Sequence, residues 1–150
     1  RGLDGRPLMV KIAPALEHEQ LEQTIDTVVS AGATGIIATN TTFSRHGLRT
    51  SIEEIGGLSG RPLFERAKDF VARIYKQTEG KIPIIGSGGV FGTDDVISMM
   101  EAGASAVQLY TGFVYEGPLL ARRILQDLVV RINQEQLPSI SSIIGRKNAI

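Results

Sequence analysis

Four short apolar runs, each followed by a longer stretch with helical spacing, constrain the fold of this chain most strongly. The apolar runs cover residues 8–12, 35–40, 82–85 and 106–110. The order βαβαβαβα implies a parallel sheet whose strands are joined by helical crossovers. Because strands covered on both faces read as nearly continuous apolar runs, these runs predict a sheet with both faces buried.

The stretches between the strands carry apolar residues at spacings of three and four, which is typical of helices with one buried face. We expect helices over about residues 17–30, 62–80 and 93–102, and from 118 onward. The predicted buried residues are Leu21, Ile25, Val28 and Val29, then Leu63, Ala67, Phe70, Val71 and Ile74, then Val96, Ile97 and Met100, and finally Leu120, Ile124, Leu128 and Ile132. Residues 137–150 show no pattern that predicts an element.

Four βα units are too few to close such a sheet. An isolated four-stranded sheet leaves two edges without backbone partners and exposes the side chains meant for a barrel interior. Four units in 150 residues scale to eight in about 300, the size of a complete (β/α)8 TIM barrel. We therefore predict that residues 1–150 are one segment, the C-terminal half of a (β/α)8 barrel, and that an N-terminal half of the same barrel completes it.

Composition excludes several classes of function. The 16 basic residues balance the 16 acidic ones, so charge gives no reason to expect nucleic acid as a partner. The chain has no cysteine, which excludes disulfides and thiolate chemistry within it, and its two histidines, His18 and His46, belong to no metal-binding pattern. No apolar run approaches the roughly 20 residues that span a bilayer.

The sequence Pro-Ile-Ile-Gly-Ser-Gly-Gly-Val at residues 83–90 predicts a buried strand that breaks into a glycine-rich turn before a helix. Glycines such as Gly88 and Gly89 let backbone N–H groups approach a phosphate with no Cβ in the way. In a βα series, such a turn is typical of the phosphate site beyond strands 7 and 8 of a barrel. Tyr110 and Thr111, at the end of the next strand, are placed to complete that site.

Polar residues at the other strand ends allow two interpretations. Lys11 lies inside an apolar strand, and it either reaches solvent from an edge or faces an anionic or electron-rich ligand. Asn40 and its neighbouring threonines either cap a turn or bind a planar heterocycle or a carboxylate. Residues 41–60 show no periodicity, and a loop of about 20 residues in a compact domain is commonly a binding loop or lid.

Five motifs, in this order, resemble dihydroorotate dehydrogenase. They are Val-Lys-Ile-Ala-Pro at 10–14, Ala-Thr-Asn-Thr-Thr at 38–42, Gly-Gly-Leu-Ser-Gly-Arg-Pro-Leu at 56–63, Ile-Ile-Gly-Ser-Gly-Gly-Val at 84–90 and Gln-Leu-Tyr-Thr-Gly at 108–112. The second and third together resemble the membrane-associated, quinone-reducing class 2 enzymes. Two residues depart from the common pattern: Ala15 stands where many relatives have Asp, and Ser87 where many have Val.

The resemblance implies an enzyme that uses flavin mononucleotide (FMN) to oxidise dihydroorotate to orotate in pyrimidine (UMP) biosynthesis, with quinone as electron acceptor. Lys11 is then expected near N1 and O2 of the flavin ring, with Thr39 also against the flavin. Asn40 and Thr41 are expected to hold the substrate. The residues expected around the FMN phosphate are Ser59, Gly60, Gly88, Gly89, Tyr110 and Thr111.

The same resemblance places several parts outside these residues. The serine that acts as catalytic base and the helical hairpin that admits quinone belong to the N-terminal half, so no catalytic residue is expected in this chain. The full enzyme is expected to associate peripherally with a membrane. That membrane is the mitochondrial inner membrane in a eukaryote, and the cytoplasmic face of the inner membrane in a bacterium.

Two other functions stay open from the sequence. One is another FMN-dependent TIM-barrel oxidoreductase with the same phosphate site, such as a hydroxy-acid oxidase or a dihydrouridine synthase. The other is a non-catalytic phosphate-binding half-barrel that dimerises to cover its open edges. Only the resemblance of the Asn40 and Thr41 motif favours a small pyrimidine as substrate.

Overall fold

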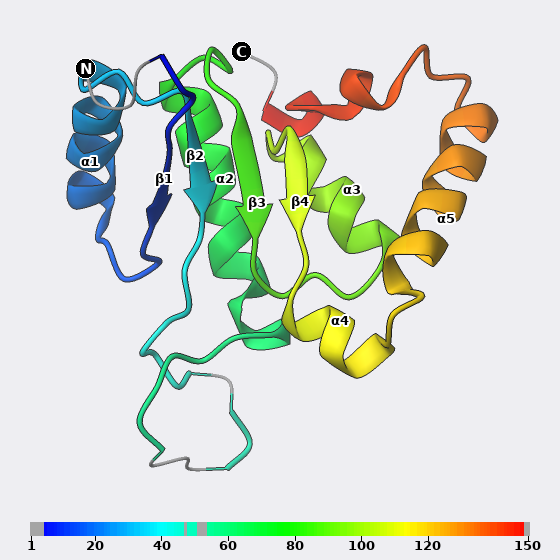
Figure 1. The fold of residues 1–150 in the computed structure, drawn as a ribbon, viewed down its shortest axis with the longest axis horizontal. Coiled ribbons are helices and arrows are strands. Elements are labelled where there is room, and N and C mark those ends of the chain that lie inside the picture. The colour runs from blue at the N-terminus through cyan, green and yellow to red at the C-terminus, as the bar shows by residue number, and fades with distance from the viewer. Residues whose placement is uncertain (1–4, 47, 51–53, 149–150) are drawn as a thin grey trace.

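The computed structural model describes residues 5–46, 48–50 and 54–148 (Figure 1). Its centre is a parallel four-stranded sheet in the order β1-β2-β3-β4. The strands are β1 (Met9–Ile12), β2 (Gly35–Ala38), β3 (Ile84–Ser87) and β4 (Ala106–Gln108). Each strand pairs with the next strand along the chain, which confirms the βα series predicted from the sequence.

Helices follow each strand. They are α1 (His18–Ser30), α2 (Phe64–Gln77), α3 (Thr93–Glu101), α4 (Thr111–Glu116) and α5 (Leu120–Gln134), and the short 3-10 helices are η1 (Arg61–Leu63), η2 (Ile140–Ile143) and η3 (Arg146–Asn148). In Figure 1, α2 and α3 lie behind the sheet, with α1 beside β1 and α5 beyond β4. None of the helices in the described ranges combines the length and apolarity needed to cross a bilayer.

The core lies between the sheet and the helices behind it. Ile84 of β3 is fully buried, and Phe70 and Ile74 of α2 are buried against it in one apolar cluster. The predicted inward faces of the helices are confirmed with two exceptions. Val29 at the end of α1 is 42% exposed, and Ile132 in the last turn of α5 is only half-buried.

The opposite face of the sheet is open. Lys11, Ile37, Ile85 and Ala106 stand side by side in the strand register, and each is exposed or only half-buried. No described helix covers this face (Figure 1). The sequence analysis expects this open face for four βα units without the other half of the barrel, and the exposure of these residues agrees with it. A parallel sheet with helices on its outer face and an exposed inner face is the geometry of half a barrel.

Three short elements lie where the sequence pattern predicts none. α4 begins at Thr111, and the strand before it ends at Gln108 rather than at residue 110. η2 and η3 form in the tail, which packs against α3. Ile143 of η2 is 1% exposed, and the N–H of Gly145 donates to the carbonyl oxygen of Met100 at 2.9 Å. The tail therefore belongs to the folded unit.

Candidate functional site

A pocket at the carboxyl ends of the strands brings all ten predicted site residues together. It has a volume of about 130 Å³. Its lining consists of Lys11, Thr39, Asn40, Thr41, Ser59, Gly60, Leu63, Ser87, Gly88, Gly89, Val90, Gln108, Tyr110, Thr111 and Gly112. Lys11 is the one charged residue among them. The lining therefore suits an anionic ligand, because it combines polar groups with a positive charge and contains no carboxylate.

The ends of β1 and β2 position the first of these residues. The N–H of Asn40 donates to the carbonyl oxygen of Ile12 at 2.8 Å, and the N–H of Thr39 donates to that of Ser87 at 2.8 Å. Thr39 is buried, and its hydroxyl donates to the carbonyl oxygen of Asn40 at 3.0 Å. The side chain of Asn40 is exposed, and its amide makes no hydrogen bond to any described residue. Its donors and its acceptor therefore remain available to a ligand.

The long loop after β2 is tied at its base. Thr42 and Leu58 form an antiparallel bridge with two hydrogen bonds, 3.0 Å and 2.6 Å long. Arg45 strengthens it, since its guanidinium donates to the carbonyl oxygens of Gly56 at 2.6 Å and Glu54 at 3.3 Å. The prediction of an irregular segment over residues 41–60 is confirmed for the part described here, and residues 47 and 51–53 lie outside it. The bridge brings the end of the loop back to the pocket.

Thr41 lies against the returning strand of this loop. A Cβ atom on Gly57 would collide with the hydroxyl oxygen of Thr41, so the Thr41 side chain packs directly on the Gly57 backbone. This contact places the Thr41 side chain beside Asn40 at the mouth of the pocket. His46 lies farther along the loop, among residues that line a different pocket.

The glycine turn after β3 packs against the start of α2. Gly88 and Gly89 have φ angles of +133° and +70°, which favour glycine. A Cβ on Gly89 would lie 2.8 Å from the backbone N and Cα of Phe64. Packing against α2 is thus a reason for glycine here that the sequence pattern does not reveal, and the phosphate role of Gly89 stays a prediction. The backbone N–H groups of both glycines donate to no acceptor in the described residues, so they are available to an anion.

Ser59 and Gly60 meet the start of α4. The hydroxyl oxygens of Ser59 and Thr111 are 2.9 Å apart and hydrogen-bonded. Gly60 has a φ of +78°, and a Cβ there would lie 3.1 Å from the Thr111 methyl carbon. Thr111 is the first residue of α4 instead of a strand end, so its N–H precedes the helical hydrogen-bond ladder. Tyr110 is 81% exposed, and its ring extends away from the packed core.

Five lining residues lie outside the predicted ten, and two of them, Ser87 and Gln108, are polar. Ser87 and Gln108 are register partners on β3 and β4 and line the pocket. Side chains alternate between the two faces along a strand. Since Val107 packs against the core on the helical side, this alternation predicts that its neighbour Gln108 lies on the opposite face. The described residues contain no group of histidine and carboxylate side chains able to hold a metal ion, and no metal was predicted.

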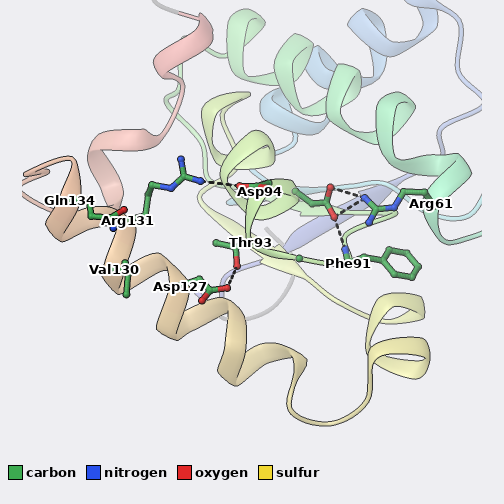
Figure 2. Close-up of a pocket in the computed structure, with 10 residues that line it drawn as sticks. Arg61, Phe91, Thr93, Asp94, Asp127, Val130, Arg131 and Gln134 are labelled. Carbon is green, nitrogen blue, oxygen red and sulfur yellow. Dashed lines mark hydrogen bonds and ion pairs between the residues drawn. The ribbon is translucent and has the colours of Figure 1, made fainter.

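A larger pocket of about 500 Å³ lies between α3 and α5 on the outside of the sheet (Figure 2). It contains none of the ten predicted site residues. Both arginines that line it are paired, Arg61 with Asp95 at 2.7 Å and Arg131 with Asp94 at 3.0 Å. Since these charges already satisfy one another, the smaller pocket at the strand ends is the better candidate site.

Known proteins resemble this chain over almost its whole length. The family model described as Dihydroorotate dehydrogenase matches residues 3–132. A dihydroorotate dehydrogenase (quinone) from Trichodesmium erythraeum is 43% identical over 152 residues, which cover 95% of this chain and 40% of the relative. One from Thermosynechococcus vestitus is 47% identical over 139 residues, covering 87% of this chain and 38% of the relative.

A solved structure also resembles this chain. The crystal structure of DHODH from Eimeria tenella in complex with ferulenol superposes with a TM-score of 0.89 at 40% identity. The match covers 97% of this chain and 39% of that chain. The chain thus spans about 40% of the length of the curated relatives it matches, and its four βα units form half of a (β/α)8 barrel. The chain belongs to the dihydroorotate dehydrogenase family.

Proposed function

We propose that the protein containing this chain oxidises dihydroorotate to orotate in pyrimidine biosynthesis, with FMN as cofactor and quinone as electron acceptor. In this proposal the chain is the C-terminal half of the barrel and supplies most of the FMN phosphate site and part of the substrate site. One observation carries it: the ten motif residues converge on a single pocket at the strand ends. Family membership, with relatives named as the quinone enzyme, supports it.

The lining of the pocket fits the phosphate of FMN. The N–H groups of Gly88 and Gly89, which donate to no described acceptor, line the pocket together with the hydroxyls of Ser59 and Thr111, and no acidic residue is among the described residues that line it. Backbone N–H groups in positive-φ turns form anion-binding concavities. The four residues, with Gly60 and Tyr110, are therefore the proposed phosphate ligands.

Lys11 is the proposed contact to the flavin ring. Its side chain stands on the open inner face of the sheet, one residue before the buried Ile12. FMN, when bound, supplies a two-electron acceptor. The ammonium group of Lys11 stabilises negative charge on whatever lies over this face, and a positive charge beside N1 is one way a protein favours the reduced flavin. Thr39, buried at the adjacent strand end, is the proposed second contact.

Asn40 and Thr41 are the proposed substrate ligands. The amide of Asn40 offers donors and an acceptor at one site, which match the alternating N–H and C=O groups of a pyrimidine ring. The hydroxyl of Thr41, held by its contact with Gly57, adds a further donor or acceptor beside it. The base that takes the substrate proton is proposed to be a serine of the N-terminal half.

Quinone reaches the enzyme, in this proposal, through a part of the protein beyond the residues described here. Relatives named dihydroorotate dehydrogenase (quinone) support that acceptor. We further propose peripheral association with the membrane that holds the quinone, which is the inner mitochondrial membrane in a eukaryote and the inner membrane in a bacterium.

The test uses the full-length protein. Orotate formation is followed with dihydroorotate and a soluble quinone. In parallel assays, dihydroorotate is replaced by a 2-hydroxy acid or by transfer RNA that contains dihydrouridine, with transfer RNA that contains only uridine as the comparison. Quinone-dependent orotate formation supports the proposal. Turnover of a hydroxy acid or of dihydrouridine instead identifies another flavin barrel, and a flavin-free homodimer that binds only phosphate identifies the non-catalytic alternative.

A further inference from the structure

We propose that Asp95 is a positioning residue for the phosphate site, acting through Arg61 and the backbone of Phe91. The inference rests on the proposed function, because it concerns how the same pocket holds the FMN phosphate. Asp95 lies outside that pocket, on the first turn of α3. Its carboxylate joins the two backbone segments whose N–H groups and hydroxyls line the pocket.

Both carboxylate oxygens of Asp95 accept hydrogen bonds, and Figure 2 labels the partners, Arg61 and Phe91. The guanidinium of Arg61 donates to both Asp95 oxygens at 2.7 Å. The N–H of Phe91 donates to Oδ2 at 2.8 Å. The Arg61 guanidinium also lies over the Phe91 ring, 4.7 Å from its centroid. Three hydrogen bonds and one cation–π contact therefore tie one carboxylate, one guanidinium and one backbone turn together.

These contacts join two segments that lead directly into the pocket. Arg61 directly follows Gly60, at the end of the long loop, and Phe91 follows the Gly88–Gly89 turn by two residues. A shift of either segment would have to break a charge-assisted hydrogen bond to Asp95. Asp95 thus fixes the spacing between the two walls of the phosphate site.

Burial makes this link stronger than an ordinary surface ion pair. The Asp95 side chain is 16% exposed, although that of Arg61 is 57% exposed. A carboxylate that is shielded from water and accepts three hydrogen bonds loses little to competing solvent. The Ser59 and Thr111 hydroxyls add a second, independent tie from the same loop to the start of α4.

A plain helix-stabilising role for Asp95 is the competing explanation. An acidic residue in the first turn favours a helix through its dipole, whatever it contacts. Asp94 shares that turn and carries the same charge, but its side chain is 89% exposed and pairs with Arg131 on the outer side. Asp94→Asn therefore removes the same helix-dipole contribution without touching the link, and it is the matched control.

The experiment compares two flavins. Apo forms of the full-length wild type, Asp95→Asn, Asp94→Asn and Arg61→Gln proteins are titrated with FMN and with riboflavin, which lacks the phosphate, and flavin fluorescence gives each dissociation constant. The ratio of the two constants isolates the phosphate contribution. Thermal unfolding of each apo protein, measured alongside, reports general stability.

We expect Asp95→Asn and Arg61→Gln to weaken FMN binding about tenfold while riboflavin binding changes less than about threefold. Asp94→Asn leaves the ratio at the wild-type value. Equal weakening of both flavins, or an unchanged or tighter FMN constant in both link variants, overturns the positioning role alone. A wild-type protein that binds neither flavin overturns the proposed function and this inference with it.

Discussion

The hydroxyl oxygens of Ser59 and Thr111 lie 2.9 Å apart although 52 residues separate them in the chain. The hydrogen bond joins the end of the long loop after β2 to the first residue of α4. Both residues line the pocket at the strand ends. The pocket is therefore assembled from loops of different βα units, and its shape depends on links between them.

Removing the Thr111 hydroxyl tests this link. Thr111→Val keeps the shape of the side chain but leaves Ser59 without its partner, so FMN affinity of the full-length protein is expected to fall by about 1 kcal/mol, or roughly fivefold. Flavin titration of the apo protein measures it. Thr93→Val is the matched control, because the Thr93 hydroxyl donates to Asp127 outside this pocket. Identical FMN constants in both variants and the wild type would count against the link.

Gly89→Ala is expected to disrupt the glycine turn. The new Cβ would lie 2.6 Å from the Phe64 Cβ and would strain a φ of +70°, so unfolding free energy should drop by about 2 kcal/mol or more, with loss of bound flavin. Gly92→Ala is the control, since a Cβ on Gly92 would meet nothing within 4 Å and its φ is −167°. Chemical denaturation and flavin content of both variants are the measurements. A Gly89→Ala protein as stable as Gly92→Ala would refute the packing role.

Much of the fold follows from apolar spacing. α2 shows why: Phe70, Val71 and Ile74 fall on one face and are completely buried. α4 does not follow, because its apolar residues Phe113 and Tyr115 are exposed, so no periodic buried face marks it. The short stretch between β4 and Pro118 also leaves little pattern to read.

The candidate site was predictable as a set of residues but only partly as a geometry. Motif order places Asn40 and Gly89 at neighbouring strand ends. The sequence could not show that the Gly89 Cβ position is blocked by α2, since that contact joins residues 25 positions apart through packing. Nor could it show that Asp95 reaches back to Arg61, because acidic residues in a first helical turn usually need no partner.

Asn40→Ala is expected to weaken orotate binding by about 1–3 kcal/mol, because polar groups of the bound pyrimidine would lose their partner. The amide side chain makes no hydrogen bond to any described residue, so its removal should leave stability and flavin content near wild-type values. Orotate titration of the holoprotein gives the affinity. Unchanged orotate affinity would remove Asn40 from the substrate site.

Glu101 links stability to acid pH. Burial raises the pKa of this carboxyl, but hydrogen bonds from Lys147 and Arg146 outweigh burial and hold the pKa below its ordinary value of 4.5. The pKa of Glu101 is lower in the folded state than in the unfolded state. The ionised carboxylate therefore adds fully to the free energy of unfolding above about pH 4.5, and this stabilisation is lost as the pH falls through the folded pKa.

Glu101→Gln should therefore destabilise the full-length protein by roughly 1–2 kcal/mol at pH 7, with the deficit shrinking below pH 4.5. Urea unfolding of the wild type and the variant from about pH 3 to about pH 7, which spans the protonation of Glu101, measures the difference in unfolding free energy. Glu22→Gln is the control, since the Glu22 side chain belongs to no ion pair within the described ranges. A deficit that does not vary with pH would contradict the ionic role.

A crystal structure of the full-length protein with FMN and orotate bound would decide whether the pocket at the strand ends holds the cofactor and the substrate. We predict the flavin phosphate within hydrogen-bonding distance of the N–H groups of Gly89 and Thr111, the ring beside Lys11, and orotate on the amide of Asn40. A phosphate bound elsewhere, such as the pocket between α3 and α5, or an orotate that does not touch Asn40, would contradict this assignment.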